Sequence, residues 1–147
     1  MALKVEVSVG EFLDKLTILE IKSERFTDAA QLANVTAELQ NLRETWAASP
    51  LSSRDIADPL QRLKAVNEKL WEIEDAIRAL DAAGSFGEEF IRLARAVYVT
   101  NDERAAIKRE LNTMLGSRLV EEKSYCHYGK DPRSPASGNP PSNRETP

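Results

Sequence analysis

Residues 59–80, PLQRLKAVNEKLWEIEDAIRAL, carry the strongest secondary-structure signal in the chain. Aliphatic residues recur here every three or four positions, which is the spacing of one face of an α-helix. Asp58 and Pro59 suit the start of this helix, since Asp is a favoured N-cap and Pro a favoured first helical residue. The apolar positions are Leu63, Val66, Leu70, Ile73, Ile77 and Leu80. The stretch therefore predicts a helix that buries one face.

The N-terminal part of the chain predicts a helix with two buried faces. Ser8 and Glu11 form a capping box, in which each side chain can bond the backbone amide of the other. The main apolar stripe that follows consists of Val9, Phe12, Leu16, Leu19 and Phe26. A second group lies opposite this stripe and consists of Asp14, Ile18, Ile21 and Arg25. We therefore expect this helix at the centre of a bundle or at a dimer seam.

Two further helices complete the predicted fold. One begins at residue 27 or 28 and follows a coiled-coil-like spacing to Trp46. The other follows a capping box at Ser85 and runs to Leu115. An interruption is expected near residues 99–100, because residues 100–103, TNDE, resemble another capping box. Amphipathic helices with short connections predict an all-α fold, in which antiparallel helical hairpins pack as a four- to five-helix bundle.

The two ends of the chain differ from this helical pattern. Residues 4–9 alternate between apolar and polar, which is typical of a strand. Its partner would be residues 118–128 or another copy of the chain. Residues 129–147, GKDPRSPASGNPPSNRETP, hold too little apolar surface to fold and predict a disordered tail. We therefore expect one helical bundle domain over residues 1–128.

Composition excludes several classes of protein. The 147 residues have a formal net charge of −4, whereas general nucleic-acid binders usually carry a basic surplus. No apolar run approaches the roughly 18 residues that a membrane span needs. The first nine residues lack the apolar core of a signal peptide. The single cysteine, Cys126, excludes an internal disulfide and suits a reducing compartment. We therefore predict a cytoplasmic protein that neither binds nucleic acid nor inserts into membranes.

Polar residues form two stripes beside the apolar faces of the later helices. Asn67, Trp71, Glu74 and Arg78 share one stripe, and Asn101, Arg104, Lys108 and Asn112 share the other. One interpretation is a ligand cleft, because Arg, Lys and Asn side chains suit phosphate and carboxylate groups. The other is a polar network that fixes the register of the helices. The spacing favours the network and leaves the cleft open.

Signatures of catalysis are weak. The sequence has no glycine-rich phosphate loop. Cys126 and His127 are neighbours near the end of the chain, which is a poor arrangement for a nucleophile and its base. Glu72, Asp75 and Asp102 could gather a hard cation for nucleotide hydrolysis, but acidic surface residues at such spacing are common. We assign no catalytic residue and expect no metal and no cofactor.

Four blocks of the sequence together resemble a known family. They are EVSVGE at residues 6–11, DKLTILEIK at 14–22, VNxxLWxIEDxIR at 66–78 and VYxxNDxRAxIK at 97–108. The family is a bacterial one of small helical proteins, known as domain of unknown function 6165. The resemblance implies a helical protein with no established activity, whose genes often lie near genes for glycosyltransferases and surface polysaccharides.

Two hypotheses of function follow. The first is a cytoplasmic interaction or accessory protein, linked to cell-envelope polysaccharide synthesis, which binds a protein partner or forms a homo-oligomer. The second is an all-α enzyme or binder of an anionic small molecule, such as a phosphosugar or nucleotide-sugar. The residues that would line its cleft are Asn67, Trp71, Glu74, Arg78, Asn101, Arg104 and Lys108.

Overall fold

The structure, a computed structural model, describes residues 1–124. Its elements in chain order are α1 (Val9–Arg25), α2 (Ala29–Ala48), the 3-10 helix η1 (Pro50–Ser53), α3 (Ala57–Ala82) and α4 (Glu88–Met114). None of residues 1–124 lies in a β-strand. The predicted all-α fold is confirmed. Within this part of the chain, each helix is too short or too polar to span a bilayer.

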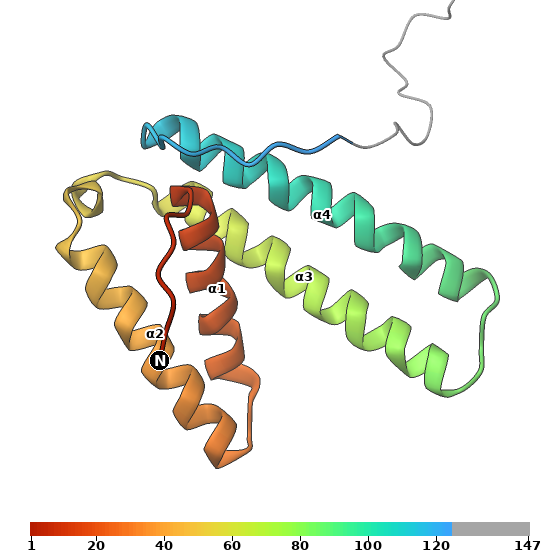
Figure 1. Ribbon diagram of the computed structural model, residues 1–147. Coiled ribbons are helices and arrows are strands. Elements are labelled where there is room, and N and C mark those ends of the chain that lie inside the picture. The colour runs from red at the N-terminus through yellow and green to blue at the C-terminus, as the bar shows by residue number, and fades with distance from the viewer. Residues whose placement is uncertain (125–147) are drawn as a thin grey trace, which may run out of the picture.

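The helices form two antiparallel hairpins that meet at one end and splay apart (Figure 1). Helices α1 and α2 make the first hairpin, and α3 and α4 make the second. Helix α1 packs against all three other α-helices, whereas α2 contacts only α1 and η1 among the helical elements. The central position expected for the first helix is therefore confirmed.

Two apolar clusters hold the hairpins together. The larger lies where α1, α3 and α4 meet and consists of Leu13, Ile56, Leu63, Ile107, Leu111 and Leu115. The smaller joins α1 to α2 and consists of Leu16, Leu19, Val35 and Leu39. Burial of these side chains is the main favourable term in the folding of such a bundle. Both clusters include residues of α1, so α1 is the helix that joins the two hairpins.

Several predicted helix boundaries are wrong. Helix α3 begins at Ala57, so Asp58 and Pro59 lie inside its first turn rather than at its start. The Asp55 side chain instead accepts a hydrogen bond from the Ala57 amide, at 3.2 Å. Helix α4 is capped by Gly87 without a side-chain bond, so the box predicted at Ser85 does not form. Helix α4 is also continuous through residues 99–100, where an interruption was expected.

The end of the second hairpin has no core of its own. From residue 74 of α3, through the loop, to residue 92 of α4, no residue is buried. We call residues 74–92 the hairpin tip. Figure 1 shows that this part of α3 and α4 extends beyond the α1–α2 hairpin. Its large apolar side chains are half-buried or exposed.

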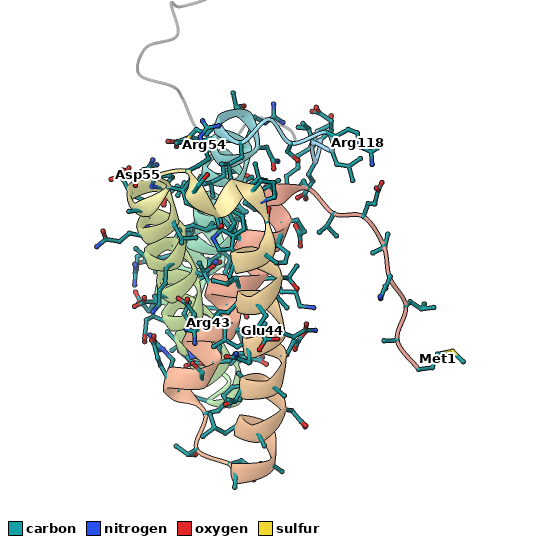
Figure 2. The ribbon with its side chains drawn as sticks, turned by 90° about the vertical axis from the view of Figure 1, so that its left-hand side faces the viewer. Met1, Arg43, Glu44, Arg54, Asp55 and Arg118 are labelled. Carbon is teal, nitrogen blue, oxygen red and sulfur yellow. The ribbon has the colours of Figure 1, made fainter. Side chains whose placement is uncertain are left out.

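The first seven residues form an extended arm that leaves the body of the protein. All of residues 1–7 are exposed, and Figure 2 shows Met1 far from the helices. Glu6 forms an ion pair with Arg118 at the base of this arm. The strand considered for residues 4–9 is not formed within residues 1–124. The predicted tail at 129–147, together with Cys126 and His127, lies outside the described residues.

Candidate functional site

Polar side chains from three helices, and one from the segment after α4, meet where α1 lies against α3 and α4. They range from buried to exposed. Buried polar groups are costly unless they find partners, so their hydrogen bonds show whether the cluster is closed or open to a ligand. We call this cluster the polar network; its members are Glu11, Asp14, Thr17, Asn67, Arg104, Lys108 and Glu121.

Asn67 of α3 is the centre of the network. Its amide nitrogen donates to Asp14 Oδ1 at 2.8 Å and to Thr17 Oγ1 at 3.0 Å. The Thr17 hydroxyl in turn donates to the backbone carbonyl of Asp14 at 2.8 Å. Asp14 and Asn67 are each only 5% exposed. Both amide hydrogens of Asn67 are therefore satisfied inside the protein, and they join α3 to α1.

Lys108 of α4 is surrounded by carboxylates. Its ammonium nitrogen lies 2.5 Å from Glu11 Oε2, 2.8 Å from Glu121 Oε2 and 3.8 Å from Asp14 Oδ2. Burial alone would lower the pKa of Lys108, but the hydrogen bonds to Glu11 and Glu121 and the charge of Asp14 raise it overall. The bond from Lys108 also lowers the pKa of Glu121. Lys108 is thus held charged, and its charge is balanced by carboxylates of the protein itself.

The Glu11 carboxylate belongs to the polar network and does not complete the capping box. The Ser8 hydroxyl accepts from the Glu11 amide at 3.1 Å, as the capping box requires. The Glu11 carboxylate, however, bonds Lys108 instead of returning to the Ser8 amide. Because an ammonium is a stronger partner for a carboxylate than a neutral amide, the ion pair replaces half of the box.

Gly10 allows α1 to approach α4 very closely. Its amide donates to Asn112 Oδ1 of α4 at 2.7 Å. A Cβ atom added at this glycine would lie 2.5 Å from the Lys108 carbonyl oxygen and 3.0 Å from Asn112 Oδ1. No other residue type fits this contact without moving a helix. Gly10 therefore sets the distance at which Lys108 can reach Glu11.

Arg104 is the exception in the network. Its Nη1 lies 3.5 Å from Asn67 Oδ1, which is long for a hydrogen bond. The residue is half-buried, and its charge contributes to the lowered pKa of Glu121. Arg104 is thus held less closely than Lys108, which donates hydrogen bonds to two carboxylates.

Comparison with known proteins identifies the family of this chain. Residues 3–142 match the family of unknown function DUF6165. The chain belongs to the DUF6165 family. No curated protein matches it, and no solved structure matches it. The resemblance that the four sequence blocks carry is therefore confirmed, and it extends over nearly the whole chain.

In this DUF6165 protein the polar network includes three of the seven residues named from the sequence. These are Asn67, Arg104 and Lys108. Trp71 lies next to the network on α3, but its ring packs on Phe26 and under the Arg25 guanidinium, 5.6 Å from the ring centroid. It is half-buried by α1 and the residue that caps it.

The other three residues do not join the network. Glu74 and Arg78 form an ion pair with each other at 3.1 Å on the surface of the hairpin tip. The Asn101 side chain is half-buried on α4 and forms no hydrogen bond with any other residue in 1–124. The seven residues are therefore divided among the network, an aromatic contact, a surface ion pair and a half-buried position on α4.

Four members of the network were not among those seven residues. The sequence places Asp14 on the second face of α1 and Glu11 in a capping box, and it predicts no site role for Thr17 or Glu121. Asp14 and Thr17 are one turn apart on α1, so a polar pair on an otherwise apolar helix face was the signal available. Glu121 follows the last helix, and no periodic pattern could place it.

Two further features limit the chemistry of this region. Among residues 1–124, no three His, Cys, Asp or Glu side chains lie close enough together to hold a metal ion. Glu72, considered for such a site, forms an ion pair with Arg25. A pocket of about 190 Å³ lies beside Lys108, between α4 and residues 121–123. Pockets for drug-sized ligands are usually about 300–1,000 Å³, so this one suits at most a small group.

Proposed function

We propose that this protein is a helical interaction protein that binds a partner protein through the hairpin tip. One observation carries the proposal: residues 74–92 contain no buried side chain, yet they hold five large apolar ones. These are Ile77, Leu80, Phe86, Phe90 and Ile91. An uncovered apolar cluster on a soluble protein commonly marks an interaction surface.

The exposed side chains of the tip are the kind that form the centre of protein interfaces. Phe86 is 56% exposed and Ile91 is 55% exposed. The Phe86 ring packs edge-on against the Phe90 ring, with centroids 5.1 Å apart, so the pair presents a fixed shape. Aromatic residues are enriched in the buried centres of interfaces, where they contribute much of the affinity.

A groove continues this surface along α3 and α4. Its volume is about 510 Å³. Apolar residues of α4, including Ile91 and Val99, line it. The charged lining residues are one carboxylate and three cations: Glu88, Lys69, Arg92 and Arg95. An apolar centre with a charged rim is the usual arrangement of an interface. A partner helix with apolar residues on one face and acidic residues at its edges would suit this groove.

In this proposal the polar network is a structural joint. Its bonds connect α1 to both helices of the second hairpin, so they fix the direction in which the tip extends. Three carboxylates already surround Lys108, which supports a structural role rather than an anion site. The joint and the binding surface are then separate parts of one molecule.

We further propose that the protein acts in the cytoplasm as an accessory to cell-envelope polysaccharide synthesis. The support for this step is the gene neighbourhood that the family resemblance implies. Partners would then be found among the enzymes that build or transfer sugars for the envelope.

A charged residue at the tip should abolish the partner interaction. We expect Ile91→Glu to reduce capture of the partner from cells at least tenfold, because a carboxylate at the centre of an apolar interface loses its hydration. The matched control is Ala37→Glu, which adds the same charge to the exposed surface of α2. Both variants should unfold at the wild-type temperature, since neither residue is buried.

Quantitative affinity capture from the native host, with the three proteins at equal levels, checks this expectation. Photo-crosslinking from position 90, compared with position 37, shows whether the captured protein contacts the tip. Equal capture by wild type and Ile91→Glu would contradict the proposal.

A second candidate function is the binding of a small anion at Arg104. The observation that favours it is the half-buried guanidinium, whose hydrogen bond to Asn67 is long, at 3.5 Å. We expect sugar phosphates or nucleotide-sugars at saturating concentration to raise the melting temperature of the wild type and not that of Arg104→Gln. Arg43→Gln, on the surface of α2, is the control. No shift with any of these ligands would reject this function.

A further inference from the structure

We infer that two copies of the chain associate through their arms, residues 1–7, which pair as an antiparallel two-stranded ribbon. The arm is the part of the described chain with the least contact to the rest. Leu3 is 94% exposed and Val5 is 83% exposed. This association uses a surface separate from the hairpin tip and goes beyond the proposed function.

The backbone of the arm offers a complete set of free hydrogen-bonding groups. The amides and carbonyls of residues 1–7 form no hydrogen bond within the described part of the chain. An extended segment with such unpaired groups is a template for pairing with another strand. Residues 118–124 are the described part of the partner segment considered within the chain, 118–128. They form the Glu6–Arg118 ion pair with the arm, and residues 119–121 line a pocket with Glu6 and Val7. No backbone hydrogen bond joins them to the arm within the described residues.

The sequence of the arm is complementary to itself in one antiparallel register. With Val5 facing Val5 of the second copy, Lys4 faces Glu6 and Leu3 faces Val7. Each ribbon then holds two cross-strand pairs of opposite charge on one face, and such pairs stabilise antiparallel strands. A shift of one residue would place apolar side chains opposite charged ones. The charges therefore select a two-fold symmetric pairing, as homodimers require.

The other face of the ribbon is apolar and can pack on a groove at the base of the arm. Leu3, Val5 and Val7 alternate with the charged residues, so they all project to one side. Val7 already lines a groove of about 180 Å³ at the base of the arm. Its other apolar lining residues are Val9, Phe12, Trp46 and Leu51. A two-stranded ribbon is marginal alone, and packing on this groove would give it the support it needs.

Charge exchange in the arm tests both the dimer and its register. We expect the full-length wild type to be a dimer by size-exclusion chromatography with light scattering. Lys4→Glu places like charges opposite each other at two symmetric positions and should weaken the dimer about tenfold or more. The double variant K4E/E6K restores opposite charges and should restore the dimer. None of these residues is buried, so all variants should show the wild-type melting temperature.

Each result has a defined meaning. A wild type that stays monomeric up to its solubility limit overturns the inference. So does a dimer that survives removal of residues 1–6, since another surface must then form it. If removal of residues 1–6 abolishes the dimer but Lys4→Glu does not weaken it, the proposed register of the ribbon is contradicted. Ile91→Glu at the tip should leave the dimer intact, so failure of one proposal is distinguishable from failure of the other.

Discussion

Gly10→Ala should lower the free energy of unfolding by about 3 kcal/mol, at the upper end for overpacking a well-packed contact. In most helices this change is favourable by roughly 1 kcal/mol, because alanine is the better helix former. Here the new Cβ would lie 2.5 Å from the carbonyl oxygen of Lys108. That atom belongs to the backbone of α4, so the clash can be relieved only by moving one helix away from the other.

Urea denaturation followed by circular dichroism measures this effect. The control is Gly87→Ala, since an added Cβ at this N-cap meets no atom within 4 Å. We expect the control to lose less than about 1 kcal/mol, the usual cost of alanine at such a position. If Gly10→Ala unfolds at the same urea concentration as the wild type, α1 cannot lie as close to α4 as the network requires.

The helices themselves could be predicted because each buries a continuous apolar face. In α3 the predicted positions Leu63 and Leu70 are both buried. The buried residues of helix α1 are harder to predict, because this helix is covered on more than one side. Leu13 belongs to neither predicted face, yet it is among the most buried side chains of the described chain. A pattern built on one apolar face cannot find all the core residues of a central helix.

A capping pattern in the sequence predicted a helix end at a place where packing between helices keeps the helix continuous. Residues 100–103 of α4 resemble a capping box, which predicted a break in the helix. Thr100 is fully buried in the structure, and its position inside the bundle keeps the chain helical there. Interactions between helices outweigh a local end signal that is worth only about 1 kcal/mol.

The candidate site could be predicted only in part, because the polar stripe on α3 extends beyond the end of α1, the helix that covers it. Asn67 and Trp71 lie where α1 and its C-cap, Phe26, reach α3. Glu74 and Arg78 continue the same stripe beyond the end of α1 and therefore remain on the surface. The spacing of a helix shows which residues share a face. It does not show where the neighbouring helix ends.

Lys108→Met should also destabilise the protein by about 3 kcal/mol, the low end for breaking a buried ion pair. Methionine keeps most of the length and the packing of the side chain, but it removes the charge that three carboxylates share. Asp14 is buried and would keep only its bond from Asn67. Glu11 and Glu121 are partly exposed and can recover water, so they limit the loss.

The opposite outcome is expected if the polar network is a binding site. Groups held ready for a ligand are often strained in its absence, so removing one commonly leaves stability unchanged or raises it. The control for a surface ion pair is Lys15→Met. Lys15 pairs with Glu38 of α2 at 2.7 Å, and both side chains are largely exposed. We expect this control to unfold almost as the wild type does.

Urea unfolding of Lys108→Met beside wild type and Lys15→Met is therefore the most direct test of whether the network is a structural joint. The joint predicts that Lys108→Met alone unfolds at clearly lower urea. Unchanged or greater stability of Lys108→Met without ligand would contradict it.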